Sequence, residues 1–279
     1  MNIEIEDENT WPDNVVRILD ENLQSLIRGQ SEQINYSKLP AIERGQHKWQ
    51  FRDKFDHIIE EINLQITDCH VVGYHCTRLL GYEIDEIREH GFMLPSTDLL
   101  QSRLQKAQEK GHITRDSAEM IGRANEYKKM PFRENRLYFV CGVSALKDEH
   151  GVHKFFQCWG GEAVYNSLEE SGQKNILFTL GEPVIIQVRL VPKKGTNLGR
   201  QLAYAYLIAR NFPTEDSPGF DYCVEQPVTA ASILKIIRFS APQFLEITKY
   251  QSWDKERQPV PAGNSCLHEQ LLVEGGFNN

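Results

Sequence analysis

The chain has few of the features that mark zinc-binding, membrane or secreted proteins. Six cysteines lie scattered along its 279 residues without a CxxC pair or a short Cys/His cluster, which argues against a structural zinc site and indicates free thiols in a reducing compartment. No apolar run approaches the roughly 18 residues of a membrane span, and the acidic start MNIEIEDENTWPD is unlike a secretory signal. Internal repeats and low-complexity segments are also missing. We expect a cytoplasmic protein that does not contact membranes and needs no metal ion.

Positive charge is in deficit, and it is unevenly placed. The chain carries 31 Lys and Arg against 39 Asp and Glu, a net charge of −8, so the whole molecule has no general attraction to a phosphate backbone. Two segments, residues 101–136 and 189–210, are nevertheless rich in Lys and Arg. They predict a local groove for a dinucleotide or a nucleic acid. The alternative is a solvated helix face and a mobile loop.

The order of apolar patterns predicts an α+β protein. With 40% hydrophobic and 25% charged residues, the chain is long enough for one domain with appendages or for two small domains. Apolar positions at helical spacing predict helices within residues 15–26 and 49–62, and again from 95 to 130, where Ser96 or Thr97 caps one helix and Thr114 opens the next. Strand signals occupy 136–142 and 183–192, the second central and buried on both faces; YAYLIARNF fits a strand or a short helix. These signals divide the chain into a helical N-terminal region (1–66), a mixed catalytic domain (67–248) and a C-terminal extension (249–279).

Residues 68–91, DCHVVGYHCTRLLGYEIDEIREHG, carry the strongest signal for chemistry. The run that ends at Tyr74 predicts a buried strand, which presents His75 and Thr77 at its C-terminal end. A short helix follows and closes at Gly91. Two interpretations of His75 stay open: a side chain that binds a ligand, or a core histidine bonded to a backbone carbonyl.

Two later segments offer further candidate residues. In RLYFVCG, the rings of Tyr138 and Phe139 point to opposite faces of a strand, so only one reaches a ligand; Tyr138 is favoured because its ring can stack while its hydroxyl keeps a polar contact. In CWGGE, the glycine pair permits close backbone approach, with Trp159 as a pocket wall. Glu162 either caps the following helix or projects into the pocket.

A third segment, DYCVEQPV at residues 221–228, places an acid in a strand before a short turn and a final strand. Glu225 is therefore either a functional carboxylate or an acid that faces solvent at a sheet edge.

In this order, the segments of His75, Tyr138 and Glu225 resemble the motifs of the ADP-ribosyltransferase superfamily, in the His-Tyr-Glu-like branch that includes diphtheria-toxin-like transferases, RNA 2'-phosphotransferases and DarT-type DNA-modifying toxins. The resemblance covers roughly residues 68–240. It implies a split, mostly antiparallel β-core with flanking helices that opens around NAD as a substrate.

The resemblance also implies roles for the candidate residues. His75 and Thr77 would position the nicotinamide ribose, and Tyr138 would stack on the nicotinamide. Glu225, with Glu162 as the alternative acid, would stabilise the oxocarbenium-like transition state, because a fixed carboxylate placed where positive charge develops lowers the barrier. Arg78 is a candidate for the pyrophosphate, since a guanidinium contacts two phosphate oxygens at once.

The sequence departs from the family pattern at two cysteines. Cys76 lies inside the first motif, and Cys223 stands two residues before Glu225, where transferases that modify protein arginines usually carry an acid or Gln. A nucleic-acid acceptor, DNA or RNA, is therefore favoured over a protein one. The resemblance further suggests a bacterial toxin or anti-phage role with an antitoxin partner. An NAD glycohydrolase and a non-catalytic module that binds a nucleotide or a partner are the alternatives.

Overall fold

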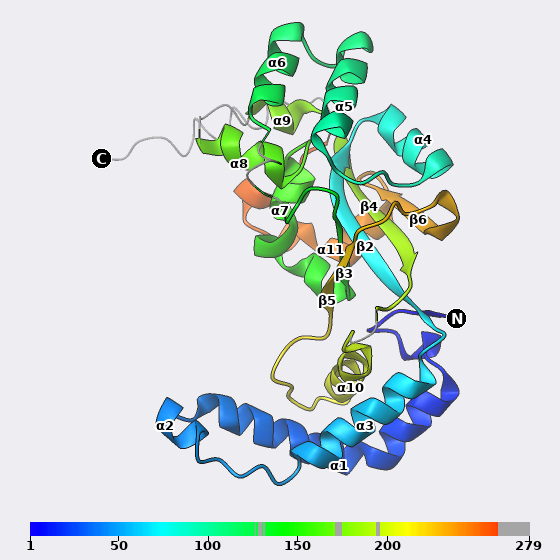
Figure 1. The fold of residues 1–279 in the computed structure, drawn as a ribbon, viewed down its shortest axis with the longest axis vertical. Coiled ribbons are helices and arrows are strands. Elements are labelled where there is room, and N and C mark those ends of the chain that lie inside the picture. The colour runs from blue at the N-terminus through cyan, green and yellow to red at the C-terminus, as the bar shows by residue number, and fades with distance from the viewer. Residues whose placement is uncertain (126, 128–129, 131, 171–174, 194–195, 262–279) are drawn as a thin grey trace. The chain divides into compact units, whose positions relative to one another are not determined.

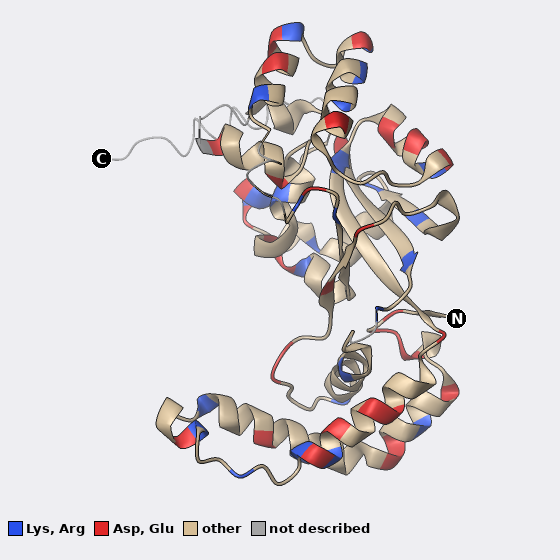
Figure 2. Cartoon of the chain, in the orientation of Figure 1, with Lys and Arg blue, Asp and Glu red and all other residues tan. Residues whose placement is uncertain are grey.

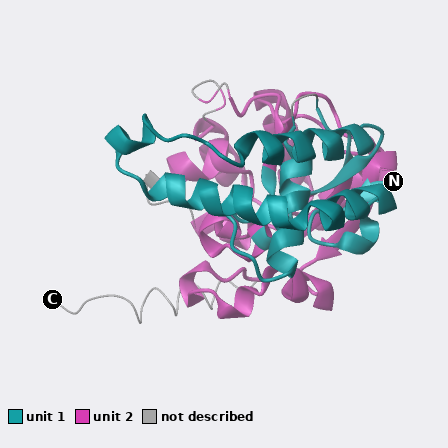
Figure 3. Cartoon of the chain, turned by 90° about the horizontal axis from the view of Figure 1, so that it is seen from below, with its two compact units in different colours: residues 1–73, 141–144, 189–220 teal, residues 74–140, 145–188, 221–279 magenta. Residues whose placement is uncertain are grey.

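The computed structural model describes residues 1–125, 127, 130, 132–170, 175–193 and 196–261. They form two compact units, which Figure 3 colours separately. The helical unit holds residues 1–73, 141–144 and 189–220. The sheet unit holds residues 74–140, 145–188 and the described part of 221–279.

Three helices build the core of the helical unit (Figure 1). They are α1 (Asp13–Lys38), α3 (Arg52–Gln65) and α10 (Leu198–Ala209), with the short α2 (Ala41–Arg44) and the 3-10 turn η1 (Glu8–Thr10) beside them. Their apolar faces meet through buried residues such as Leu19, Ile62 and Leu202, so both N-terminal helices predicted from the sequence are confirmed. The first six residues of YAYLIARNF, 204–209, are helical and end α10; residues 204–207 are buried, whereas Ile208 and Ala209 are exposed.

The helix predicted within 49–62 begins later than its apolar pattern suggests. Glu32 accepts hydrogen bonds from the backbone N–H groups of Gln50 (2.7 Å) and Phe51 (2.8 Å). A carboxylate that holds two successive N–H groups fixes this segment outside the helix, so α3 starts only at Arg52.

The sheet has the order β5-β3-β2-β4-β6, with β1 paired in parallel to the start of β2. Its strands are β1 (Asn2–Ile3), β2 (His70–Leu79), β3 (Leu137–Cys141), β4 (Glu182–Leu190), β5 (Phe220–Val224) and β6 (Ile233–Arg238). The pairs β2–β3 and β4–β6 are antiparallel. β4 lies between two strands and is largely buried, which confirms a central strand at 183–192.

Helices surround the sheet in its unit (Figure 1). They are α4 (Gly81–His90), α5 (Thr97–Glu109), α6 (Arg115–Arg123), α7 (Glu149–Gln157), α8 (Glu162–Glu170), α9 (Asn175–Thr179) and α11 (Pro242–Thr248), with the 3-10 turns η3 (Val143–Lys147), η4 (Ala230–Ser232), η5 (Tyr250–Ser252) and η6 (Lys255–Arg257). Ser96 and Thr114 accept N-terminal hydrogen bonds at α5 and α6, so these helices start at the capping residues that the sequence indicates.

The mixture of helices with a largely antiparallel sheet confirms the α+β class. One local expectation is wrong: the strand that carries His75 does not end there but runs on to Leu79. Its last residues, Arg78 and Leu79, are buried, so the strand continues because that end also belongs to the core. No helix in the described part of the chain is both long and apolar enough to cross a membrane.

Candidate functional site

The first two predicted segments lie side by side in the sheet unit. His75 is on β2 and Tyr138 on the adjacent strand β3. His75 Nδ1 is 2.9 Å from the carbonyl oxygen of Tyr138. A carbonyl oxygen only accepts, so we assign the hydrogen to Nδ1, which leaves a lone pair on Nε2.

The surroundings of His75 keep its ring uncharged. The ring contacts Phe92, edge-on at a centroid distance of 5.1 Å, and Phe139 at 5.5 Å. Burial lowers the pKa of His75, and although the Tyr138 carbonyl opposes this, the positive charge of Arg103 lowers the pKa further. A neutral imidazole with a bare Nε2 can accept a hydrogen bond from a hydroxyl group, such as that of a ribose.

The segments of His75 and Glu225 are joined by a short backbone bridge. Phe92 N–H donates to the Val228 carbonyl (2.7 Å), and Val228 N–H donates to the Phe92 carbonyl (3.2 Å). Phe92 also packs on His75, and Val228 follows Glu225 by three residues in the same turn. The first and third predicted motifs therefore meet around Phe92.

Gly91 is required for this bridge. It ends α4, as the sequence predicts, with φ of +84°, a conformation that side-chain-bearing residues seldom adopt. A Cβ at this position would lie 2.1 Å from the Val228 carbonyl oxygen. The turn that carries Glu225 can approach α4 only because no side chain is present.

Gly91→Ala is expected to lower the free energy of unfolding by more than about 2 kcal/mol, because backbone strain of about 1–2 kcal/mol adds to a backbone clash. Gly111→Ala is the matched control: Gly111 also has positive φ (+73°), but a Cβ there would meet no atom within 4 Å. Urea unfolding of the two variants should show the larger loss at Gly91. Equal losses would mean that the Val228 contact does not constrain the turn.

Tyr138 and Glu162 are connected through Arg133. The guanidinium of Arg133 lies 4.5 Å above the Tyr138 ring centre and forms an ion pair with Glu162. The Tyr138 hydroxyl donates to the Phe132 carbonyl at 2.7 Å. Tyr138 is partly exposed whereas Phe139 is buried, which confirms that the two rings divide between surface and core. One face of Tyr138 is thus already covered by a cation.

Glu225 stands at the surface. It follows β5, its side chain is 59% exposed, and its Oε1 is 3.1 Å from Arg136 Nη2. Arg133 and Arg136 both precede β3, so one short segment holds both candidate acids. The exposed Arg136–Glu225 pair contributes at most about 1 kcal/mol, so a bound ligand can rearrange it at little cost.

Arg78 and Trp159 are core residues, and their proposed contacts with NAD need correction. Arg78 is fully buried, and its guanidinium donates to four backbone carbonyls, those of Phe156, Phe178, Leu180 and Val260. Only one of its five N–H groups is left for any other acceptor. Burial dominates at Arg78 because β2 continues past His75 into the core, so we remove this residue from the pyrophosphate site.

Trp159 belongs to a buried polar cluster rather than a pocket wall. Its Nε1 donates to Glu83 (2.9 Å), and Arg103 lies 4.4 Å above its ring while also pairing with Glu83. Burial alone would raise the pKa of Glu83, but Arg103 and the donated hydrogen bonds lower it overall. Both carboxylate oxygens of Glu83 have hydrogen-bond donors, and the cluster links α4 to α5.

Two other residues of the first motif lie on β2. Thr77 is partly buried. Burial raises the pKa of the Cys76 thiol, which disfavours a thiolate there.

The basic segments predicted to form a groove are largely neutralised within their own units (Figure 2). In the helical unit Arg200 pairs with Asp56 and Arg210 with Glu8. In the sheet unit the pairs are Arg103–Glu83, Lys106–Glu86, Arg115–Glu119, Arg123–Glu119, Arg133–Glu162 and Arg136–Glu225. Apart from Glu119, which lies in α6 itself, these acids lie outside the two basic segments, so the charge of each segment alone does not include them.

Residues missed by the sequence reasoning are Phe92, Arg133 and Arg136, which connect the candidate side chains. Arg133 lay in a segment noted only for its charge, and Arg136 opens RLYFVCG, where only the two rings were considered. Phe92 carried no signal apart from its place after Gly91. Among the described residues no group of His, Cys, Asp and Glu could hold a metal ion. Comparison with protein-family models, curated proteins and solved structures finds no match to this chain.

Below pH 6.5 the free energy of unfolding is expected to decrease as the pH is lowered, and His75 is expected to cause part of that decrease. Its folded-state pKa is lowered from 6.5, so below that pH the unfolded chain binds a proton that the folded one does not. The loss amounts to at most about 1.4 kcal/mol per pH unit and stops below the folded pKa. Urea unfolding from pH 7.5 to 5 should show a shallower dependence in His75→Asn. His153, whose pKa burial also lowers, is present in both proteins and cancels. Parallel curves would contradict a neutral His75.

Proposed function

We propose that the sheet unit is an ADP-ribosyltransferase that uses NAD as a substrate. The observation that carries this proposal is the Phe92–Val228 bridge, which joins the turn of Glu225 to the ring that packs on His75. Three segments spaced along about half of the chain therefore meet in the order and combination that the family resemblance implies. The strands β2 to β6, all within residues 67–248, would be the split core of that family.

In this reaction the bond between the ribose C1' and the nicotinamide nitrogen breaks. Nicotinamide leaves with the bonding electron pair, and a nucleophile on the acceptor attacks C1' and loses its proton. His75 Nε2 would accept a hydrogen bond from a ribose hydroxyl, Thr77 would line the same site, and the free face of Tyr138 would stack on nicotinamide. The Glu225 carboxylate, released from Arg136, would stabilise the positive charge that develops on the ribose.

The acceptor proposed is a nucleic acid, DNA or RNA, with a toxin or anti-phage role in the cytoplasm and an antitoxin as partner. One observation favours a second candidate, an NAD glycohydrolase in which water attacks C1'. The arginines expected to line an acceptor groove, Arg200 and Arg210, are ion-paired with acids, so positive charge available for a polyanionic acceptor is reduced. The two functions share the same bond cleavage and the same acid.

Release of nicotinamide from NAD by the purified chain tests this proposal, measured alone and with single-stranded DNA, RNA or cell extract. Release stimulated by one acceptor, together with transfer of label from NAD to that acceptor, supports the transferase. Release without any transfer supports the glycohydrolase. Nicotinamide release no faster than in a reaction without protein, under every condition, would overturn both enzymes and leave a nucleotide-binding module.

A further inference from the structure

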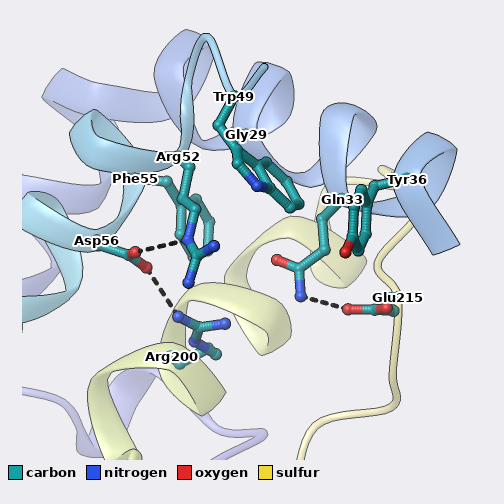
Figure 4. A pocket seen from close by; sticks show the side chains of 9 residues that line it. All are labelled: Gly29, Gln33, Tyr36, Trp49, Arg52, Phe55, Asp56, Arg200 and Glu215. Carbon is teal, nitrogen blue, oxygen red and sulfur yellow. Dashed lines mark hydrogen bonds and ion pairs between the residues drawn. The ribbon is translucent and has the colours of Figure 1, made fainter. Parts of the chain in front are cut away.

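The helical unit contains a cavity of about 240 Å³ that the proposed enzyme does not use (Figure 4). Its walls come from α1, from the segment before α3, from α3 and α10, and from the segment after α10. All of them belong to one unit. We refer to it as the α1–α3 pocket; the side chains that matter below are Gln33, Tyr36, Trp49, Arg52, Arg200 and Glu215.

One wall of the pocket is aromatic. The rings of Tyr36 and Trp49 lie 4.5 Å apart between centroids, and His47 supports Trp49 from 4.9 Å. Trp49 precedes the two backbone N–H groups that Glu32 holds, so its segment is fixed although it is not helical. Aromatic side chains that are half-exposed and held in place by such bonds form stacking platforms for flat rings.

A second wall carries two guanidinium groups. Asp56 accepts from Arg200 Nη2 at 2.8 Å and lies 3.5 Å from Arg52 Nε, so one carboxylate holds two arginines and the trio keeps a net charge of +1. Figure 4 shows both arginines turned toward Asp56 at one side of the cavity. Arg200 Nε is buried and lacks an acceptor among the described residues. Arg200 therefore keeps an unmet donor, and Arg52 lies 5.1 Å over the Trp49 ring centre. Two guanidinium groups beside an aromatic wall suit the phosphate of a ligand whose base displaces Arg52 from that ring.

The opposite side of the pocket carries an amide and a carboxylate. Gln33 donates to Glu215, and the Glu215 backbone N–H donates to the buried Gln30 at 3.1 Å. Figure 4 shows Gln33 and Glu215 together, away from the two arginines. A positioned carboxylate accepts hydrogen bonds from the N–H groups of a base edge. Guanine offers two adjacent N–H donors on its Watson–Crick edge, which match one carboxylate.

We propose that the α1–α3 pocket binds a guanine nucleotide, with the base on Trp49 and Tyr36, its donor edge on Glu215 and its phosphate on Arg52 and Arg200. The cavity is smaller than the roughly 300 Å³ at which drug-sized pockets begin, which suits one nucleotide rather than a dinucleotide such as NAD. The ligand is either a free mononucleotide or a nucleotide within a single strand. The inference does not rest on the proposed transferase, since it concerns other residues in another unit.

Titration of the full chain with GMP, followed by tryptophan fluorescence and by calorimetry, tests the proposal. GMP is expected to quench fluorescence and to bind at least about tenfold more tightly than UMP, as each good base-edge contact contributes about 1–3 kcal/mol of discrimination. Trp49→Ala should weaken binding about tenfold or more through lost stacking. Trp49→Phe should retain calorimetric binding but lose most of the quenching, because the other tryptophans lie outside the pocket.

Arg52→Gln should weaken GMP binding but not guanosine binding, whereas Arg44→Gln, an exposed arginine of α2 that does not line the cavity, should change neither. Glu215→Gln should abolish the preference for GMP over UMP. A parallel titration with a short guanine-containing single strand assigns the source of the nucleotide. The proposal is overturned if neither GMP nor the strand binds at millimolar concentration, or if binding is the same in Trp49→Ala and Glu215→Gln as in the wild type. Circular dichroism verifies that each variant is folded.

Discussion

Glu225→Gln is expected to slow nicotinamide release from NAD by at least about a hundredfold while changing the Kd for NAD by less than about tenfold. Gln has the same shape as Glu and keeps an oxygen that accepts a hydrogen bond from a ribose hydroxyl. It lacks the negative charge, which matters only when positive charge develops on the ribose as the glycosidic bond breaks. Single-turnover rates and equilibrium binding of NAD, measured on the same preparations, separate the two effects.

Two matched variants control this experiment. Glu162→Gln removes the other candidate acid, which Arg133 connects to Tyr138; a large rate loss there with a small one at position 225 would exchange the two roles. Asp221→Asn removes an exposed acid from β5, the strand that Glu225 follows, and should leave turnover unchanged. If Glu225→Gln weakens binding and turnover by equal factors, Glu225 contacts NAD without stabilising the transition state.

Arg78→Met is expected to lower the free energy of unfolding by about 4 kcal/mol or more, because it leaves several buried carbonyls without a donor, each at about 1–3 kcal/mol. The carbonyl of Phe156 is in α7, that of Phe178 is in α9, and that of Leu180 directly follows α9. The fourth carbonyl is that of Val260, near the end of the described chain. One side chain on β2 therefore fastens three separate stretches of backbone. Burial lowers the pKa of Arg78 to about 10, so the guanidinium remains charged at neutral pH.

Urea unfolding measures this loss, with Arg238→Met as the control. Arg238 also projects from a strand and pairs with Glu182, but its side chain is 52% exposed, so its replacement should cost less than about 1 kcal/mol. Arg78→Lys should recover little of the stability, because an ammonium group has fewer donors and lacks the planar fork of a guanidinium. A loss below about 1 kcal/mol in Arg78→Met would show that the carbonyls find other partners.

The sequence by itself determined the elements whose signal is local. Helical spacing of apolar residues located α1, α5 and α6, and Ser96 and Thr114 located the starts of the last two, because a helix buries one stripe and its first N–H groups need an acceptor nearby. The absence of strict alternation in residues 183–192 identified β4 as a central strand. Gly91 could be recognised as the end of α4. Alternation placed Tyr138 and Phe139 on opposite faces of β3, since successive side chains of a strand point in opposite directions, and the hydroxyl of Tyr138 favoured it as the ring on the open face.

Tertiary structure alone decided what the charged residues do. The residues next to Arg78 in the sequence do not predict the four carbonyls that accept its hydrogen bonds. These carbonyls lie between 78 and 182 residues away along the chain. The pairs Arg133–Glu162 and Arg136–Glu225, and the aromatic and arginine walls of the α1–α3 pocket, likewise combine distant segments. The periodic spacing of apolar residues in the sequence predicts which side chains are buried. The role of a charged side chain depends instead on the partner that the fold places within a few ångströms of it. The sequence could therefore nominate His75, Tyr138 and Glu225, but their surroundings came from the packing of the sheet.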